Sequence, residues 1–196
     1  MSGLLGGVAT CTVLFTLLVA SAEHLSRPAA LAGALAAHRV LPAPVTVAAL
    51  VIASESVLAG TGIVALLHDN GKGLLSAVLV GSFALLGLYA GYGLYLISTG
   101  RTGSCGCSRM ELPMTGWVVA RASVLAGLAL IGLFLSGSTI PPERTDAPLA
   151  VVLLASATFT ALLWHLPAAM NDPGTATTGR SPTGRSIGTA EGGLPG

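Results

Sequence analysis

Two cysteines separated by a single residue, Cys105 and Cys107, are the clearest candidates for chemistry in this chain. They stand in a polar segment between two long apolar stretches, with Arg101 and Arg109 on either side. Cationic neighbours favour the thiolate, which is the nucleophilic form of cysteine. A disulfide that closes so small a ring should be strained, and strained disulfides are more oxidising and more labile. The pair therefore predicts thiol–disulfide exchange.

Two other interpretations of the cysteine pair stay open. The thiols could bind a metal or a partner, but a zinc site needs four ligands and no histidine is close in sequence, so no metal ligand set is assigned. They could also be two idle thiols in a flexible loop. The third cysteine, Cys11, lies within an apolar stretch and is expected to be a small buried residue.

Three ionisable residues, Glu55, Arg121 and His24, are candidates for supporting the cysteines. Glu55 lies near the middle of an apolar stretch, where a charge costs about 2.5–3.5 kcal/mol unless it finds a partner. The available cation is Arg121, about one turn inside another apolar stretch, and the two side chains could meet as a structural or a mechanistic pair. A neutral Glu55 is a third alternative. His24 could shuttle protons to a thiol or could be an interfacial polar cap.

The composition indicates that a membrane scaffold positions these residues. Hydrophobic residues make up 53% of the 196 residues and charged ones only 9%, against about a quarter charged in soluble proteins. The net charge is +1 and no run of Lys and Arg is present, so there is no electrostatic field for nucleic acid. The sequence therefore favours a lipid bilayer as partner and excludes nucleic acid.

Five apolar segments are long enough to cross the hydrocarbon core of a membrane. Between the first two, Ser26–Arg39 is too short to span and is expected to be a helix at the interface, with His38 at a surface or an interface. Small residues at Gly87 and Gly91, and at Ser123 and Gly127, could mark close helix contacts, or glycine could simply be common in this chain. The five segments are Gly3–Ala22, Ala43–Leu67, Leu74–Ser98, Trp117–Ser136 and Ala147–Leu166.

The predicted fold class is all-α integral membrane: a four-helix transmembrane bundle with an interfacial helix, plus a fifth C-terminal transmembrane helix. From Asn171 onward Gly, Thr, Ser and Pro dominate. Such a composition cannot bury enough apolar surface to offset the entropy of ordering. We therefore expect a membrane domain over residues 1–137, an additional transmembrane helix over 138–170 and a disordered tail over 171–196.

Several short motifs in this order resemble the MauE/DoxX group of small redox-associated membrane proteins, over about Gly3 to Gly137. They are Ala22-Glu23-His24-Leu25 with Arg27-Pro28, then His38-Arg39-Val40-Leu41-Pro42, Glu55, Cys105-Gly106-Cys107, and Trp117 with Arg121.

The resemblance implies a four-helix bundle that helps disulfides form outside the cytoplasm. MauE is linked to maturation of the small, disulfide-rich subunit of methylamine dehydrogenase. The bundle also looks like the vitamin K epoxide reductase type, in which quinone accepts electrons from membrane thiols. Quinone is therefore the one cofactor that the resemblance suggests, and a thioredoxin-like protein or an exported client is the expected partner.

The side of the membrane that carries the cysteines is predicted differently by two arguments. More arginines accompany the cysteine segment and the tail than the opposite loops, which have Lys72 and Arg144. The positive-inside rule therefore puts the cysteines in the cytoplasm, where thiols are kept reduced. The resemblance implies that the cysteines lie on the external face of the cell membrane, and we expect them there.

Two functions of other classes compete with a thiol–disulfide oxidoreductase. One is a non-enzymatic membrane assembly or chaperone subunit that holds a partner through the cysteine loop. The other is a small-solute transporter that uses Glu55 and Arg121, which has less support because no internal repeat is evident.

Overall fold

The described part of the chain is entirely helical apart from short turns. The computed structural model describes residues 2–68, 71–100, 115–135 and 146–169, and no strand occurs in these ranges. Five of its six helices are long and apolar enough to cross a membrane, which confirms the predicted fold class. The cysteine segment and the predicted tail lie outside the described residues. The helices are α1 (Ser2–Ser26), α2 (Pro28–His38), α3 (Pro44–Leu67), α4 (Lys72–Ser98), α5 (Gly116–Leu135) and α6 (Asp146–Ala169).

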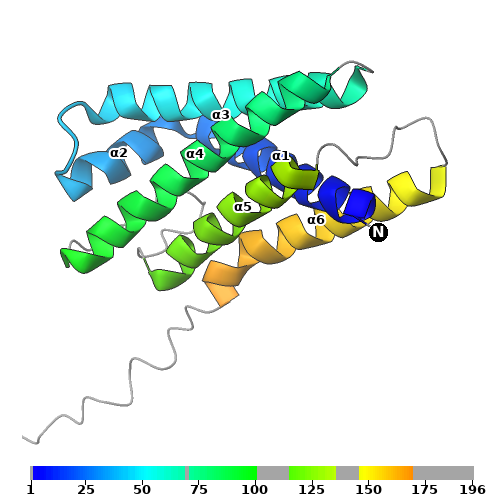
Figure 1. Ribbon diagram of the computed structural model, residues 1–196. Coiled ribbons are helices and arrows are strands. Elements are labelled where there is room, and N and C mark those ends of the chain that lie inside the picture. The colour runs from blue at the N-terminus through cyan, green and yellow to red at the C-terminus, as the bar shows by residue number, and fades with distance from the viewer. Residues whose placement is uncertain (1, 69–70, 101–114, 136–145, 170–196) are drawn as a thin grey trace, which may run out of the picture.

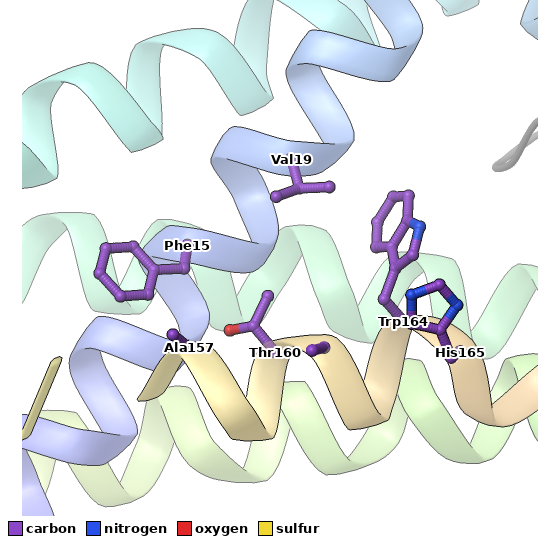
Figure 2. Close-up of a pocket in the computed structure, with 7 residues that line it drawn as sticks. Phe15, Val19, Ala157, Thr160, Trp164 and His165 are labelled. Atoms are coloured by element: carbon purple, nitrogen blue, oxygen red, sulfur yellow. The ribbon is translucent and has the colours of Figure 1, made fainter. Parts of the chain in front are cut away.

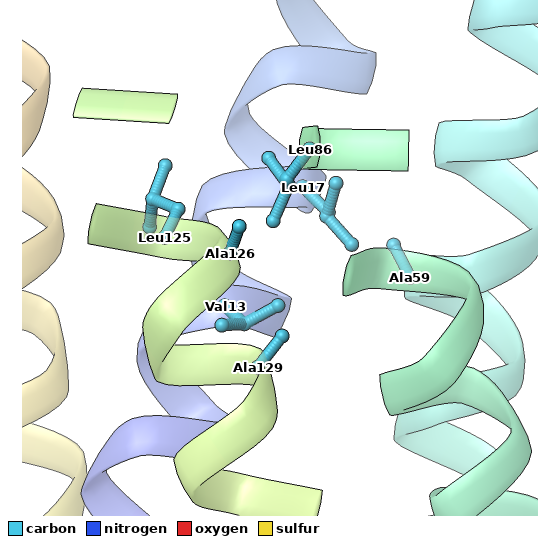
Figure 3. Packing of buried hydrophobic residues seen from close by; sticks show 7 residues of the cluster. All are labelled: Val13, Leu17, Ala59, Leu86, Leu125, Ala126 and Ala129. Atoms are coloured by element: carbon cyan, nitrogen blue, oxygen red, sulfur yellow. The ribbon is translucent and has the colours of Figure 1, made fainter. Parts of the chain in front are cut away.

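Four of the long helices form a bundle in which α1 and α4 each contact both α3 and α5. The other two helices lie outside this ring: α2 packs on α3, and α6 packs mainly along α1 (Figure 1). Leucine, valine and alanine side chains of all four bundle helices meet in the centre (Figure 3). The members of this cluster are Val13, Leu17, Ala59, Leu86, Leu125, Ala126 and Ala129.

Prolines mark the breaks between the first three helices. Only Arg27, in a non-helical conformation, separates α1 from α2, because Pro28 disfavours helical geometry at the residue before it. Pro28 and Pro44 then occupy the first turns of α2 and α3, where a missing N–H costs nothing. The chain therefore turns sharply after α1, and α2 buries Leu31 and Leu35 against α3.

Polarity is distributed as expected for a protein surrounded by lipid. Large apolar side chains such as Leu88 and Phe134 are 70% and 80% exposed, while Glu55 and Ser82 are fully buried. Buried hydroxyls also join the helices: Ser156 of α6 donates a hydrogen bond to the backbone oxygen of Val8 at 3.2 Å. In a bilayer such an outer surface needs no further cover, and helix association relies on packing and internal polar contacts.

Close helix contacts occur at glycines other than those suggested by the sequence. A Cβ at Gly62 would overlap the Leu14 side chain of α1 and come within 3.3 Å of Val78, and one at Gly132 would lie 2.7 Å from the Thr10 hydroxyl. Cβ atoms at the predicted contact glycines Gly87, Gly91 and Gly127 would instead meet nothing within 4 Å. These three glycines therefore make no close helix contact among the described residues, because their helices are rotated so that other glycines face the neighbouring helices. This agrees with the alternative that glycine is simply common in this chain.

Candidate functional site

Glu55 is the most deeply buried ionisable side chain that the structure describes. Its side chain is 1% exposed, and it lies halfway along α3, about 16 Å from the start of that helix. An ionisable group at such depth in a membrane protein needs a partner, and it is a candidate for a functional site.

The carboxylate of Glu55 has partners on two other helices. The Tyr89 hydroxyl of α4 donates a hydrogen bond to Oε1 at 2.8 Å. Nε2 of His24, near the end of α1, lies 3.7 Å from Oε2, which is an ion-pair distance when the imidazole is protonated. His24 is itself only 5% exposed. We call His24, Glu55 and Tyr89 the polar centre. These three side chains join three bundle helices inside the membrane, where lipid offers no hydrogen bonds.

Arg121 does not pair with Glu55, although the sequence suggested this cation. Its guanidinium carbon lies 5.2 Å from the centroid of the Trp164 ring, which belongs to α6. A guanidinium over an indole face is an attractive cation–π arrangement. Helix α6 therefore supplies this contact of Arg121, and His24 is the ionisable side chain that lies beside Glu55.

A cavity of about 360 Å³ lies beside the polar centre. Its walls come from α1 to α5, and they are mostly apolar, with His24, Tyr89 and Arg121 among the polar lining residues. A second polar contact lines it: Nδ1 of His38 lies 3.1 Å from the Tyr92 hydroxyl. His38 was expected at a surface or an interface, but it is 4% exposed, because α2 directs it towards α4.

The structure thus brings together three of the five predicted site residues. His24 and Arg121 line the cavity, and Glu55 contacts His24 behind it. The other two, Cys105 and Cys107, lie outside the described residues, in the connection from the end of α4 to the start of α5. Arg121 is about 8 Å from the start of α5, so the cavity occupies the half of the bundle from which the chain continues to the cysteines.

Tyr89, Tyr92 and Trp164 were not identified from the sequence. Tyr89 and Tyr92 are three residues apart in one apolar helix, so they share a face of it. Two tyrosine hydroxyls on one face of a span could have been predicted as hydrogen-bond partners for the lone carboxylate of another span. Trp164 had no comparable signal, because its role depends on how α6 packs.

A shallow groove of about 350 Å³ between α1 and α6 shows how Trp164 is held (Figure 2). Phe15 and Val19 of α1 face Ala157 and Thr160 of α6, and Trp164 and His165 stand at one end of the groove. The Thr160 hydroxyl also lies 3.4 Å from the backbone oxygen of Thr12. These contacts fix α6 on α1, so Trp164 stays beside Arg121.

Arg121 and Trp164 are expected to show an energetic coupling of about 0.5–2 kcal/mol in a double-mutant cycle of Arg121→Gln and Trp164→Leu. The measurement is reversible unfolding of the purified protein in mixed micelles. A matched cycle of Trp164→Leu with Lys72→Gln, at the opposite end of the bundle, should be additive. Equal coupling in both cycles would mean that the ring contact contributes nothing specific.

The fold and the site together define a multi-pass helical membrane protein with a polar centre buried among its spans. The chain belongs to the MauE family, since the family model described as Methylamine utilisation protein MauE matches residues 2–135. This confirms the predicted resemblance, and it associates the chain with methylamine utilisation. The match covers α1 to α5, and α6 lies beyond it. Neither a curated protein nor a solved structure matches the chain.

Proposed function

We propose that this protein is a membrane thiol–disulfide oxidoreductase that helps form disulfides in an exported client protein. Cys105 and Cys107 carry the exchange, and the polar centre with Arg121 manages the accompanying protons and charge. The protein resides in the cell membrane, with the cysteine segment on the external face, where disulfides persist. A thioredoxin-like protein or the client itself is the partner.

The observation that carries the proposal is the convergence of titratable side chains on one cavity inside the bundle. His24 and Arg121 line that cavity, and Glu55 accepts a hydrogen bond from Tyr89 beside it. A structural ion pair alone would not require a cavity at its side. A site that moves protons for thiol chemistry does require groups that bind and release them within the membrane.

The exchange itself follows ordinary thiol–disulfide chemistry. A client thiolate attacks one sulfur of the Cys105–Cys107 disulfide, forms a mixed disulfide and releases the other cysteine as a thiolate. A second client thiolate then displaces the bound cysteine, so the client gains one S–S bond and the protein keeps two thiols. To act again, the pair must lose two electrons and two protons.

Membership of the MauE family supports this assignment, because the family is described as a methylamine utilisation protein family. The disulfide-rich client implied by the family resemblance would need an oxidant of this kind. The protein's own disulfide would be strained and therefore oxidising, which suits donation to a client.

Trapping the thiols in growing cells tests the proposal. In a Cys11→Ser background, alkylation with a mass tag before and after reduction should show a substantial fraction of Cys105 and Cys107 as a disulfide. Cys105→Ser and Cys107→Ser should each leave one free thiol and abolish oxidation of the client. Cys11 is buried in α1, so Cys11→Ser alone should change neither result.

Two fully reduced thiols, together with an intact client disulfide in both serine variants, would exclude the redox function. Co-purification of a partner that survives both replacements would then support the assembly-subunit alternative.

A further inference from the structure

The cysteine pair must pass its electrons to an acceptor, and the acceptor has to accept protons as well. Each turnover of the proposed function leaves two S–H groups that become one S–S bond, with two electrons and two protons to remove. An acceptor that enters a cavity between membrane-spanning helices must dissolve in lipid. The chemical class that combines these properties has a ring with two carbonyl groups and an apolar tail.

The cavity beside the polar centre has the size and the walls for such a ring. Its volume of about 360 Å³ falls in the range of about 300–1,000 Å³ that is usual for small-molecule sites. Most of its lining is aliphatic, including Leu31, Leu35 and Val51. Leu88 also lines it and is 70% exposed, so the cavity reaches the lipid-facing surface, and a tail could leave there.

Hydrogen-bond donors for ring carbonyls come from two groups of side chains. Arg121 carries only donors on its guanidinium, and it lines the cavity from α5. The Tyr92 hydroxyl and His38 line the cavity from α4 and α2, within 3.1 Å of each other. His24 is 5% exposed and contacts Glu55, so a titratable pair stands beside the place where protons would be needed.

We infer that this cavity binds a lipid-soluble quinone, which accepts the electrons of the cysteine pair; the inference rests on the proposed function. The two cysteine S–H bonds break and one S–S bond forms, while two electrons and two protons end as two O–H bonds on the reduced ring. Arg121 and the His38–Tyr92 pair bind the carbonyl groups. His24 and Glu55 supply and replace the protons.

Binding can be measured without any thiol chemistry. The full chain with Cys105→Ser and Cys107→Ser is purified in lipid nanodiscs and titrated with a benzoquinone that carries a ten-carbon tail, and quenching of tryptophan fluorescence is recorded. Saturable quenching is expected. Ala34→Phe fills the cavity and should raise the Kd at least tenfold, whereas Ala37→Phe, on the exposed side of the same helix α2, should leave it unchanged.

A second variant keeps the inference testable if Ala34→Phe fails to fold. Tyr92→Phe keeps the cavity volume and removes one hydroxyl, so it should weaken binding of the quinone without affecting a tail-only competitor such as decanol. Equal displacement by decanol in the parent protein, or an unchanged Kd in Ala34→Phe, would overturn the inference in favour of a lipid-filled cavity. Quinone binding by a parent protein whose cysteines never oxidise would instead refute the proposed function, and thiol oxidation without quinone binding would refute the inference alone.

Discussion

Replacing Glu55 with leucine and Tyr89 with phenylalanine together should leave the protein folded but slow reoxidation of the cysteine pair by about a hundredfold or more. The Tyr89 hydroxyl donates to Glu55 at 2.8 Å, so the double variant removes both members of this hydrogen bond, and His24 is the member of the polar centre that remains. Replacing both partners of a buried hydrogen bond by apolar groups of similar shape is nearly neutral for stability. The double variant should therefore lose most of the reoxidation rate while its stability changes little.

A purely structural role for Glu55 predicts the opposite pattern. Breaking a buried ion pair that holds the bundle together would cost about 3–5 kcal/mol and would leave the intrinsic thiol chemistry unchanged. Thermal unfolding in nanodiscs and the rate of thiol reoxidation, measured on the same preparation, distinguish the two roles. Ser54→Ala is the matched control, because the Ser54 hydroxyl donates to the backbone oxygen of Val51 in its own helix, at 2.8 Å.

The single variants add detail to this experiment. Glu55→Gln keeps an oxygen that can accept from Tyr89 but loses the ionisable group that faces His24 at 3.7 Å. If proton transfer through the polar centre matters, Glu55→Gln should be nearly as slow as the double variant while Tyr89→Phe alone keeps a larger share of the rate. Parental rates in all three variants would remove the polar centre from the redox function.

Gly62→Leu should lower the unfolding free energy by about 1–3 kcal/mol, whereas Gly60→Leu should not. Both glycines lie in α3, so the gain in helix propensity is the same and cancels in the comparison. A side chain at Gly62 would overlap Leu14 and press against Val78, while one at Gly60 would meet nothing within 4 Å. The difference measures the close approach of α1, α3 and α4.

A second substitution shows whether the overlap is the cause. Leu14→Ala removes the side chain that a residue at position 62 would meet, so the combined variant should recover part of the stability lost in Gly62→Leu. Thermal unfolding with circular dichroism is the measurement. Equal destabilisation at both glycines, or no recovery with Leu14→Ala, would show that the two helices do not approach each other at this point.

Helix identity and the location of a buried charge were predictable because both depend on local sequence. A span is recognised from length and hydropathy alone, and the five predicted spans correspond to five long helices. Glu55 stood out because an ionisable side chain is rare within an apolar span, and the span is recognised from the local sequence. Cys11 was likewise expected to be buried from the apolar residues around it, and it is.

The rotation of each helix about its own axis depends on packing and could not be predicted from the sequence. A helix that is apolar on every side carries little periodic signal to say which face is inside. For this reason the sequence suggested Gly87 and Gly91 as contacts, while packing uses Gly62 and Gly132.

The contacts of the site residues also depend on how the helices are rotated. Local sequence was enough to place Glu55, His24 and Arg121 in the apolar helices of a membrane protein. Only packing decided that Glu55 meets His24 and Tyr89, and that Arg121 lies over Trp164 of a helix beyond the family match. Interhelical partners depend on rotations and tilts that sum over all contacts of the bundle, and no local stretch of sequence contains that sum.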